Sequence, residues 1–118
     1  MFKTLLMTVF STILIGFSAL VGAADAAVII VSHEVADFGA WKKRFDAGKG
    51  AREKAGLTER YVMRDVNKPN FVIVVLEAGS VQNAKKFVSN PAFKERIKKA
   101  SASGTAEIKI GTTNTAGK

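Results

Sequence analysis

The sequence contains no cysteine, and among its 118 residues there is only one histidine, one tryptophan and one tyrosine. The lack of cysteine excludes a disulfide framework and a lipid-modified amino-terminal cysteine. A single histidine, His33, with scattered carboxylates makes no convincing metal set. A phosphate-binding glycine loop, a dinucleotide fingerprint and a nucleophile elbow are also missing. The sequence therefore predicts neither a metal nor a cofactor.

The amino-terminal segment has the order of features that marks a cleavable export signal. Lys3 gives a short positive region, residues 5–21 are apolar apart from Thr, Ser and Gly, and small residues follow up to Ala26. An apolar run of about 17 residues is at the lower limit for crossing a bilayer, so cleavage is favoured over a membrane anchor. We predict that residues 1–26 are a signal peptide and that the mature protein is periplasmic or secreted.

Acidic residues are few: 10 aspartates and glutamates stand against 18 lysines and arginines, which gives a formal net charge of +8. For an exported protein we expect no nucleic-acid partner, so an anionic membrane surface or polymer, an acidic small molecule and plain solubility remain as explanations. We expect the helices to carry these charges on the outside of the molecule. The basic residues of the two predicted helical regions are Lys42, Lys43, Arg44, Lys49, Arg52, Lys54, Lys85, Lys86, Lys94, Arg96, Lys98 and Lys99.

The chain after the signal peptide shows strand and helix patterns in the order β-α-β-β-α-β. The predicted strands are residues 27–35, 57–66, 71–76 and 106–110, and the predicted helical regions are residues 38–55 and 81–100. Asp37 and Ser80 are predicted to cap the helices, Gly56 to follow the first, and Asn90-Pro91 to interrupt the second. This order predicts a ferredoxin-like α+β fold, an antiparallel four-stranded sheet with helices on one face. We place this domain at residues 27–111 and a flexible tail at 112–118.

The first and third strands differ from the other two. Residues 28–31 and 71–76 are continuous apolar runs, whereas the second and fourth strands alternate. In the ferredoxin-like topology the first and third strands are central, and a sheet covered on one side only should alternate everywhere. A second protomer, stacked sheet against sheet, is the cover that a chain of this size can obtain. We therefore predict a homodimer.

Residues 31–42, 64–65, 69–70 and 89–93 resemble the dimeric α/β-barrel superfamily, and more narrowly the small proteins grouped with antibiotic-biosynthesis monooxygenases and cyclase-like domains. The resemblance implies a homodimer with a pocket in each protomer. It implies no single reaction, because the superfamily includes monooxygenases, haem-degrading enzymes and polyketide-type cyclases. Monooxygenase-type members tend to carry histidines in the second helix, where residues 86–93 have none, and this argues against haem ligation.

Four side chains are the predicted site residues. His33 ends the first strand with the parity of Ile29 and is predicted to act as a general acid or base, with a structural bond to a neighbouring loop as the alternative. Cyclase-like relatives place a histidine at a similar position. Tyr61 is the second predicted catalytic residue, since a buried phenol needs a partner. Trp41 and Phe45 share a helix face and are predicted to line a ligand pocket together with Tyr61, unless they are plain core.

Three functions agree with the sequence. The leading one is an exported homodimer that binds a small apolar or aromatic organic molecule. The second is a cofactor-independent monooxygenase or cyclase-like enzyme that uses His33 and Tyr61, and the third is a non-catalytic basic module that docks on an anionic envelope component. An apolar pocket that contains His33 would favour the first two, and a filled core with His33 in solvent would favour the third.

Overall fold

The structure is a computed structural model, and it describes residues 26–113. The predicted signal peptide lies outside the described residues apart from Ala26, so export and cleavage stay predictions. Residues 114–118 of the predicted tail also lie outside this part. Within residues 26–113, no helix has the length and apolar character needed to cross a membrane.

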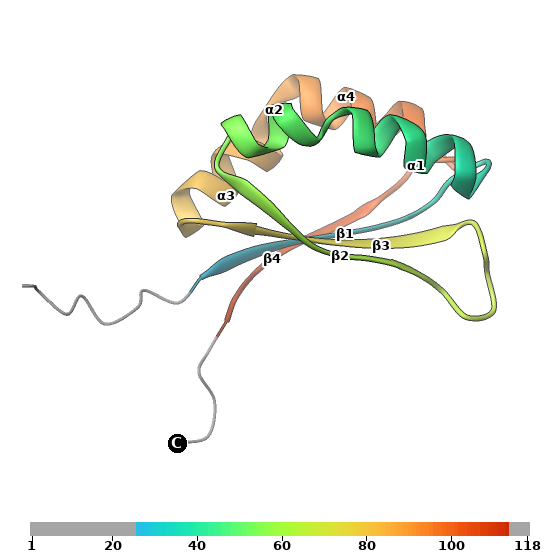
Figure 1. The fold of residues 1–118 in the computed structure, drawn as a ribbon, viewed down its shortest axis with the longest axis horizontal. Helices are drawn as coiled ribbons and strands as arrows, with labels where there is room; N and C mark the ends of the chain where they lie inside the picture. Colours follow the sequence, from blue (N-terminus) through green and yellow to red (C-terminus); the bar gives the residue numbers. More distant parts are fainter. Residues whose placement is uncertain (1–25, 114–118) are drawn as a thin grey trace, which may run out of the picture.

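The described chain folds in the predicted order of strands and helices (Figure 1). The elements are β1 (Ala27–Glu34), α1 (Phe38–Ala47), α2 (Lys49–Lys54), β2 (Leu57–Arg64), β3 (Phe71–Ala78), α3 (Val81–Ser89), α4 (Pro91–Ala100) and β4 (Glu107–Thr112). Their strands form an antiparallel sheet in the order β2-β3-β1-β4, and the helices lie on one face of it (Figure 1). The ferredoxin-like α+β fold and the central position of the first and third strands are thereby confirmed. β4 reaches one residue into the predicted tail.

Both predicted helical regions are divided into two helices. The backbone of Gly48, with φ −85° and ψ 1°, ends α1 and begins α2. Glycine weakens a helix interior, so the prediction of one continuous helix over residues 38–55 was wrong at this point. Asn90 leaves the helical conformation before Pro91, which takes the first turn of α4, and the predicted interruption is confirmed.

Hydrogen bonds at the helix ends confirm the predicted capping residues. The Asp37 carboxylate accepts a hydrogen bond from the Ala40 backbone N–H at 2.8 Å, and the Ser80 hydroxyl accepts one from the Asn83 N–H at 3.0 Å. Gly56 follows α2 with φ +80°, the left-handed conformation that glycine adopts most easily. These ends fix where each helix starts over the sheet.

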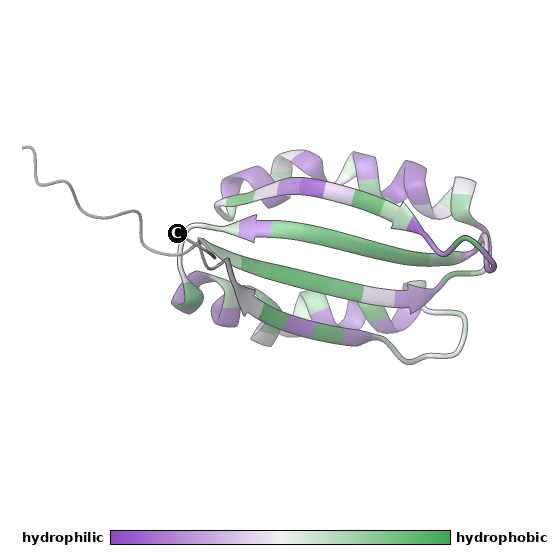
Figure 2. Cartoon of the chain, turned by 90° about the horizontal axis from the view of Figure 1, so that it is seen from below, coloured by the Kyte–Doolittle hydropathy of each residue, from purple (hydrophilic) through white to green (hydrophobic). Residues whose placement is uncertain are grey.

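The two faces of the sheet are both apolar at their centre. On the helix side, alternate residues of the central strands are buried, namely Ala27, Ile29, Val31, His33, Val72, Val74, Leu76 and Ala78. On the opposite side, Figure 2 shows β1 and β3 as apolar along most of their length. We call this side the open sheet face and define it by Val28, Ile30, Tyr61, Met63, Ile73 and Val75. The predicted doubly apolar central strands are therefore confirmed.

Candidate functional site

A cavity of about 340 Å³ lies between the sheet and the helices. Its floor comes from the central strands, and its walls carry the aromatic side chains Trp41, Phe45, Phe87 and Phe93. Trp41 stacks on Phe45 with ring centroids 4.9 Å apart, and Phe87 contacts Phe93 with centroids 4.6 Å apart. The cavity is therefore an apolar space with two aromatic walls.

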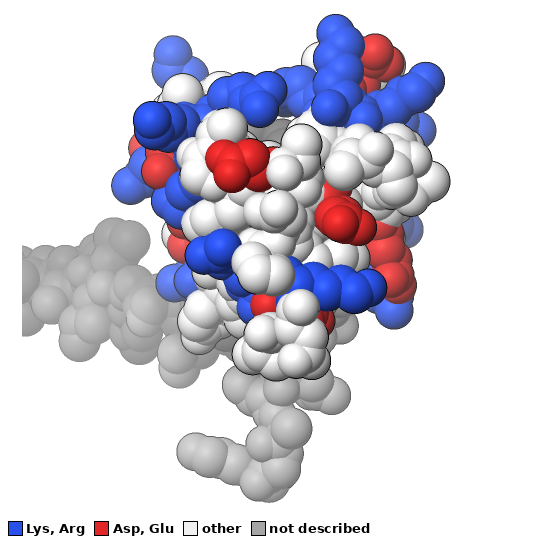
Figure 3. Space-filling view, turned by 90° about the vertical axis from the view of Figure 1, so that its right-hand side faces the viewer, with Lys and Arg blue, Asp and Glu red and all other residues white. Residues whose placement is uncertain are grey.

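Arg44, Arg52, Arg96 and Lys99 also line this cavity, and no aspartate or glutamate of the described chain does. Figure 3 shows lysine and arginine side chains gathered over the helix layer at the top of the view. Arg44, Arg96 and Lys99 are exposed at the rim of the cavity, as expected for helical charges on the outside, whereas the Arg52 side chain is only 14% exposed, and for Arg52 the expectation was wrong. Helical spacing is the sequence signal that could have found Arg52, because it follows Phe45 by two turns. Residues 26–113 contain no cluster of His, Cys, Asp and Glu able to hold a metal ion.

His33 is the buried polar residue of the cavity floor, with 2% of its surface exposed. Its Nδ1 lies 2.7 Å from the Ser101 hydroxyl, and this hydroxyl donates to the backbone oxygen of Ile97 at 2.7 Å. A serine hydroxyl has one proton, so the His33 Nδ1–H is the donor in the first of these bonds. Nε2 is then the unprotonated nitrogen, and the described residues offer it no hydrogen-bond partner. His33 thus has one ring nitrogen free to accept a hydrogen bond, on a side chain that lines the cavity.

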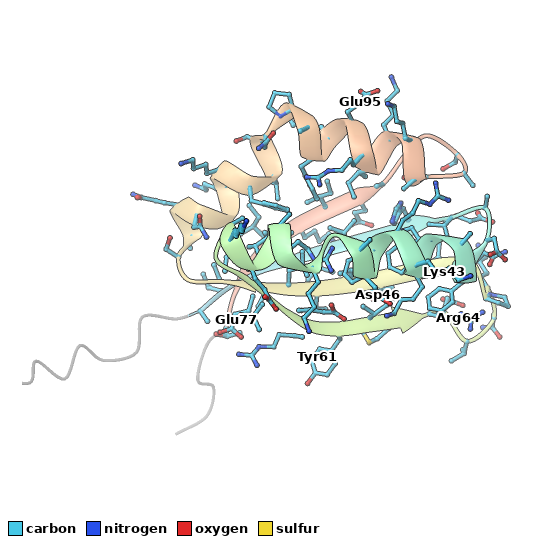
Figure 4. All side chains as sticks on the ribbon, turned by 45° about the horizontal axis from the view of Figure 1, so that its top comes forward. Lys43, Asp46, Tyr61, Arg64, Glu77 and Glu95 are labelled. Atoms are coloured by element: carbon cyan, nitrogen blue, oxygen red, sulfur yellow. The ribbon has the colours of Figure 1, made fainter. Side chains whose placement is uncertain are left out.

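Tyr61 lies apart from these residues. Its pairing with Val75 places it on the open sheet face, 62% exposed, and Figure 4 shows its side chain pointing away from the helices. Successive strand residues point to opposite faces, so the sheet separates Tyr61 from the cavity. The structure brings together His33, Trp41 and Phe45, and the prediction that Tyr61 shares their pocket was wrong.

Three solved structures have similar folds. A mutant of SnoaB, a cofactor-independent oxygenase from Streptomyces nogalater, has a TM-score of 0.59 at 16% identity over 79% of this chain and 97% of that one. The ActVA-Orf6 monooxygenase of Streptomyces coelicolor, in complex with nanaomycin D, has a TM-score of 0.57 at 16% identity over 78% and 90%. A dimeric ferredoxin-like protein from an uncultured marine organism has a TM-score of 0.51 at 13% identity over 79% and 91%.

The chain shares its ferredoxin-like fold with these three structures. The resemblance seen in the sequence is thus confirmed at the level of the fold. No protein-family model and no curated protein matches the chain. Many functions share this ferredoxin-like fold, so the evidence for the function must come from the cavity and its side chains.

Burial lowers the pKa of His33 below its ordinary value of 6.5, because a charged imidazole is poorly solvated in the apolar floor. Below about pH 6.5, His33 binds a proton in the unfolded chain more readily than in the folded domain. The free energy of unfolding therefore decreases as the pH falls. We expect the melting temperature to fall more steeply from about pH 7 to about pH 5 in the wild type than in His33→Gln. Thermal denaturation across this range measures it, and equal slopes would show that the folded domain protonates His33 freely.

Proposed function

We propose that the protein binds a small, apolar organic molecule in the cavity between the sheet and the helices. The observation that supports this most is the combination of two aromatic walls with one buried imidazole whose Nε2 is free. Ligand pockets of about 300–1,000 Å³ are typical, and an apolar cavity of about 150 Å³ already admits benzene. A cavity of about 340 Å³ therefore suits a molecule of two or three fused rings.

A hydroxyl on the ligand would match the polar group of the floor. A phenol or enol donates its proton toward a neutral imidazole, and Ser101 holds the His33 ring from the other side through Nδ1. Binding of a hydroxylated aromatic compound would thus give His33 Nε2 a hydrogen bond that the described residues do not supply. The proposed ligand is a fused-ring compound with a hydroxyl at the His33 end.

Cofactor-independent oxygenation of such a compound is the second proposed function. His33 would serve as the general base that removes the hydroxyl proton and leaves an electron-rich anion in the apolar cavity. Two structural neighbours support this choice, since one is described as a cofactor-independent oxygenase and the other as a monooxygenase in complex with nanaomycin D. Turnover of a bound compound with oxygen uptake would separate this function from binding alone.

We further propose that two protomers stack their open sheet faces on one another. Tyr61 is 62% exposed and Met63 41% exposed on this face, beside the partly buried Ile30, Ile73 and Val75. An apolar surface across the centre of a sheet is typical of a protein interface, and a C2 dimer buries the same surface on both copies. The dimeric ferredoxin-like neighbour supports dimerisation as such.

A matched pair of ligands tests the proposed role of His33. We expect 2-naphthol to bind the wild type more tightly than 2-methoxynaphthalene, which has no hydroxyl proton to donate. His33→Phe should weaken 2-naphthol binding by about tenfold and leave 2-methoxynaphthalene binding unchanged. Thermal shift and calorimetry on the purified protein measure both.

Tyr61→Phe is the control, because it removes a hydroxyl from the opposite side of the sheet. Its binding of 2-naphthol should equal that of the wild type. If neither compound binds the wild type at millimolar concentration, the small-molecule proposal is contradicted. Docking of the basic helices on an anionic envelope component would then be the leading interpretation.

A further inference from the structure

Arg52 on α2 and Arg96 on α4 both line the cavity. Burial is the main reason that the pKa of Arg52 is lowered; Glu59 and Asp46 act against it, and the positive charge of Arg96 adds to it. Two guanidinium groups from separate helices therefore face one largely apolar space. Like charges repel, and a bound anion between them would relieve the repulsion.

The Arg52 guanidinium is held rigidly and has unused donors. Its side chain is 14% exposed, its Nη1 donates to the backbone oxygen of Phe45 at 2.7 Å, and its Cζ lies 3.7 Å from the centroid of the Phe45 ring. Nη2 is buried and makes no hydrogen bond within the described residues, although Glu59 Oε2 lies 3.7 Å away. The ion pair with Glu59 compensates part of the cost of burying this group, and the Arg52 side chain still lines the cavity that a ligand would fill.

The shape of the surroundings indicates what kind of anion fits. Arginine binds carboxylates with two parallel hydrogen bonds, and its flat guanidinium stacks on aromatic rings. The layer of Arg52 on Phe45 continues into the stack of Phe45 on Trp41. A flat acid can thus place its rings along the aromatic wall and its carboxylate beside the arginines. Walls of low polarity around charges of one sign strengthen this attraction.

We propose that the ligand is a planar aromatic acid, with its carboxylate held by Arg52 and Arg96 and its rings packed on the aromatic walls of the cavity. This inference rests on the proposed small-molecule function and specifies its ligand class. Together with the His33 acceptor, it points to fused-ring hydroxy acids as the compounds that use every polar group of the site.

The test compares 2-naphthoate with 2-naphthamide, which has the same rings and a neutral head group. We expect 2-naphthoate to bind the wild type at least about tenfold more tightly, with a preference that decreases as salt is added. Arg52→Gln and Arg96→Gln should each lose most of this preference and keep their affinity for 2-naphthamide. Calorimetry at low and high salt gives both affinities.

Lys54→Gln on α2 and Lys98→Gln on α4 are the matched controls, because each removes one positive charge that does not line the cavity. They should keep the wild-type preference. Arg96 is exposed, so its variant tests the inference even if Arg52→Gln fails to fold. The acid inference is overturned if the wild type binds 2-naphthoate and 2-naphthamide equally, or if the controls lose as much of the preference for 2-naphthoate as the cavity variants do. Either result leaves the small-molecule proposal standing. Failure of 2-naphthoate, 2-naphthamide and 2-naphthol alike overturns both.

Discussion

Replacing Ile30 by aspartate should convert the protein from a dimer to a monomer at micromolar concentration. Ile30 lies at the centre of the open sheet face, between Val75 on β3 and Lys109 on β4. In a pair of stacked sheets this position is dry, and burial of a carboxylate there costs several kcal/mol, which the neighbouring Lys109 offsets only in part. A loss of about 4 kcal/mol corresponds to a dissociation constant about a thousandfold higher. Sedimentation velocity over a concentration series measures the shift.

The monomer itself should tolerate this substitution, because the new carboxylate would face water on a side of the sheet that the helices do not cover. Gln82→Glu on α3 adds the same charge to the helix side, where Gln82 is exposed, and should leave the dimer intact. Met63→Asp, at an exposed position of the open sheet face, gives a second variant should Ile30→Asp lose its circular dichroism spectrum. A monomeric wild type, or a dimer that survives both aspartates, would contradict the sheet-to-sheet assembly.

Local rules in the sequence were enough to predict most of the fold. Continuous apolar runs identified the central strands, and the parity of His33 with Ile29 and Val31 placed all three on one face, where the structure buries them. The capping positions of Asp37 and Ser80 follow from side-chain chemistry within three residues of each helix start. Each of these predictions depends on residues that are close in sequence, or on the alternation of side chains between the two faces of a single strand.

The errors concern features that depend on the packing of distant segments. Because the sheet is apolar on both faces, the alternation in β2 could not show which side Tyr61 takes, and a register shift between Glu59 and Tyr61 interrupts that strand's pairing. The bond from His33 to Ser101 joins residues 68 positions apart. The cavity is the space between the sheet and the helices, and the basic residues that line it depend on how those helices are placed over the sheet.

Replacing Trp41 by alanine should lower the free energy of unfolding by about 3–5 kcal/mol. Trp41 is 8% exposed, stacks on Phe45, and contacts Phe38 and His33 with ring centroids 5.8 Å and 6.3 Å away. Small domains have total stabilities of about 5–15 kcal/mol, so this one side chain would supply a large share. Because α1 has no other buried residue, its attachment to the sheet depends on Trp41 more than its length suggests.

Thermal denaturation should show a melting midpoint lower by roughly 4–8 °C for each kcal/mol lost. Variants are compared at one protomer concentration, because the proposed dimerisation would stabilise the fold. Trp41→Phe is the matched control, since it keeps an aromatic ring against Phe45 and removes less buried surface. It should cost clearly less than the alanine. A loss below about 1 kcal/mol for Trp41→Ala would show that the side chain serves the cavity alone. A large loss in stability for Trp41→Ala, with weaker 2-naphthol binding in the folded Trp41→Phe variant, would show that one indole both anchors α1 and forms a wall of the site.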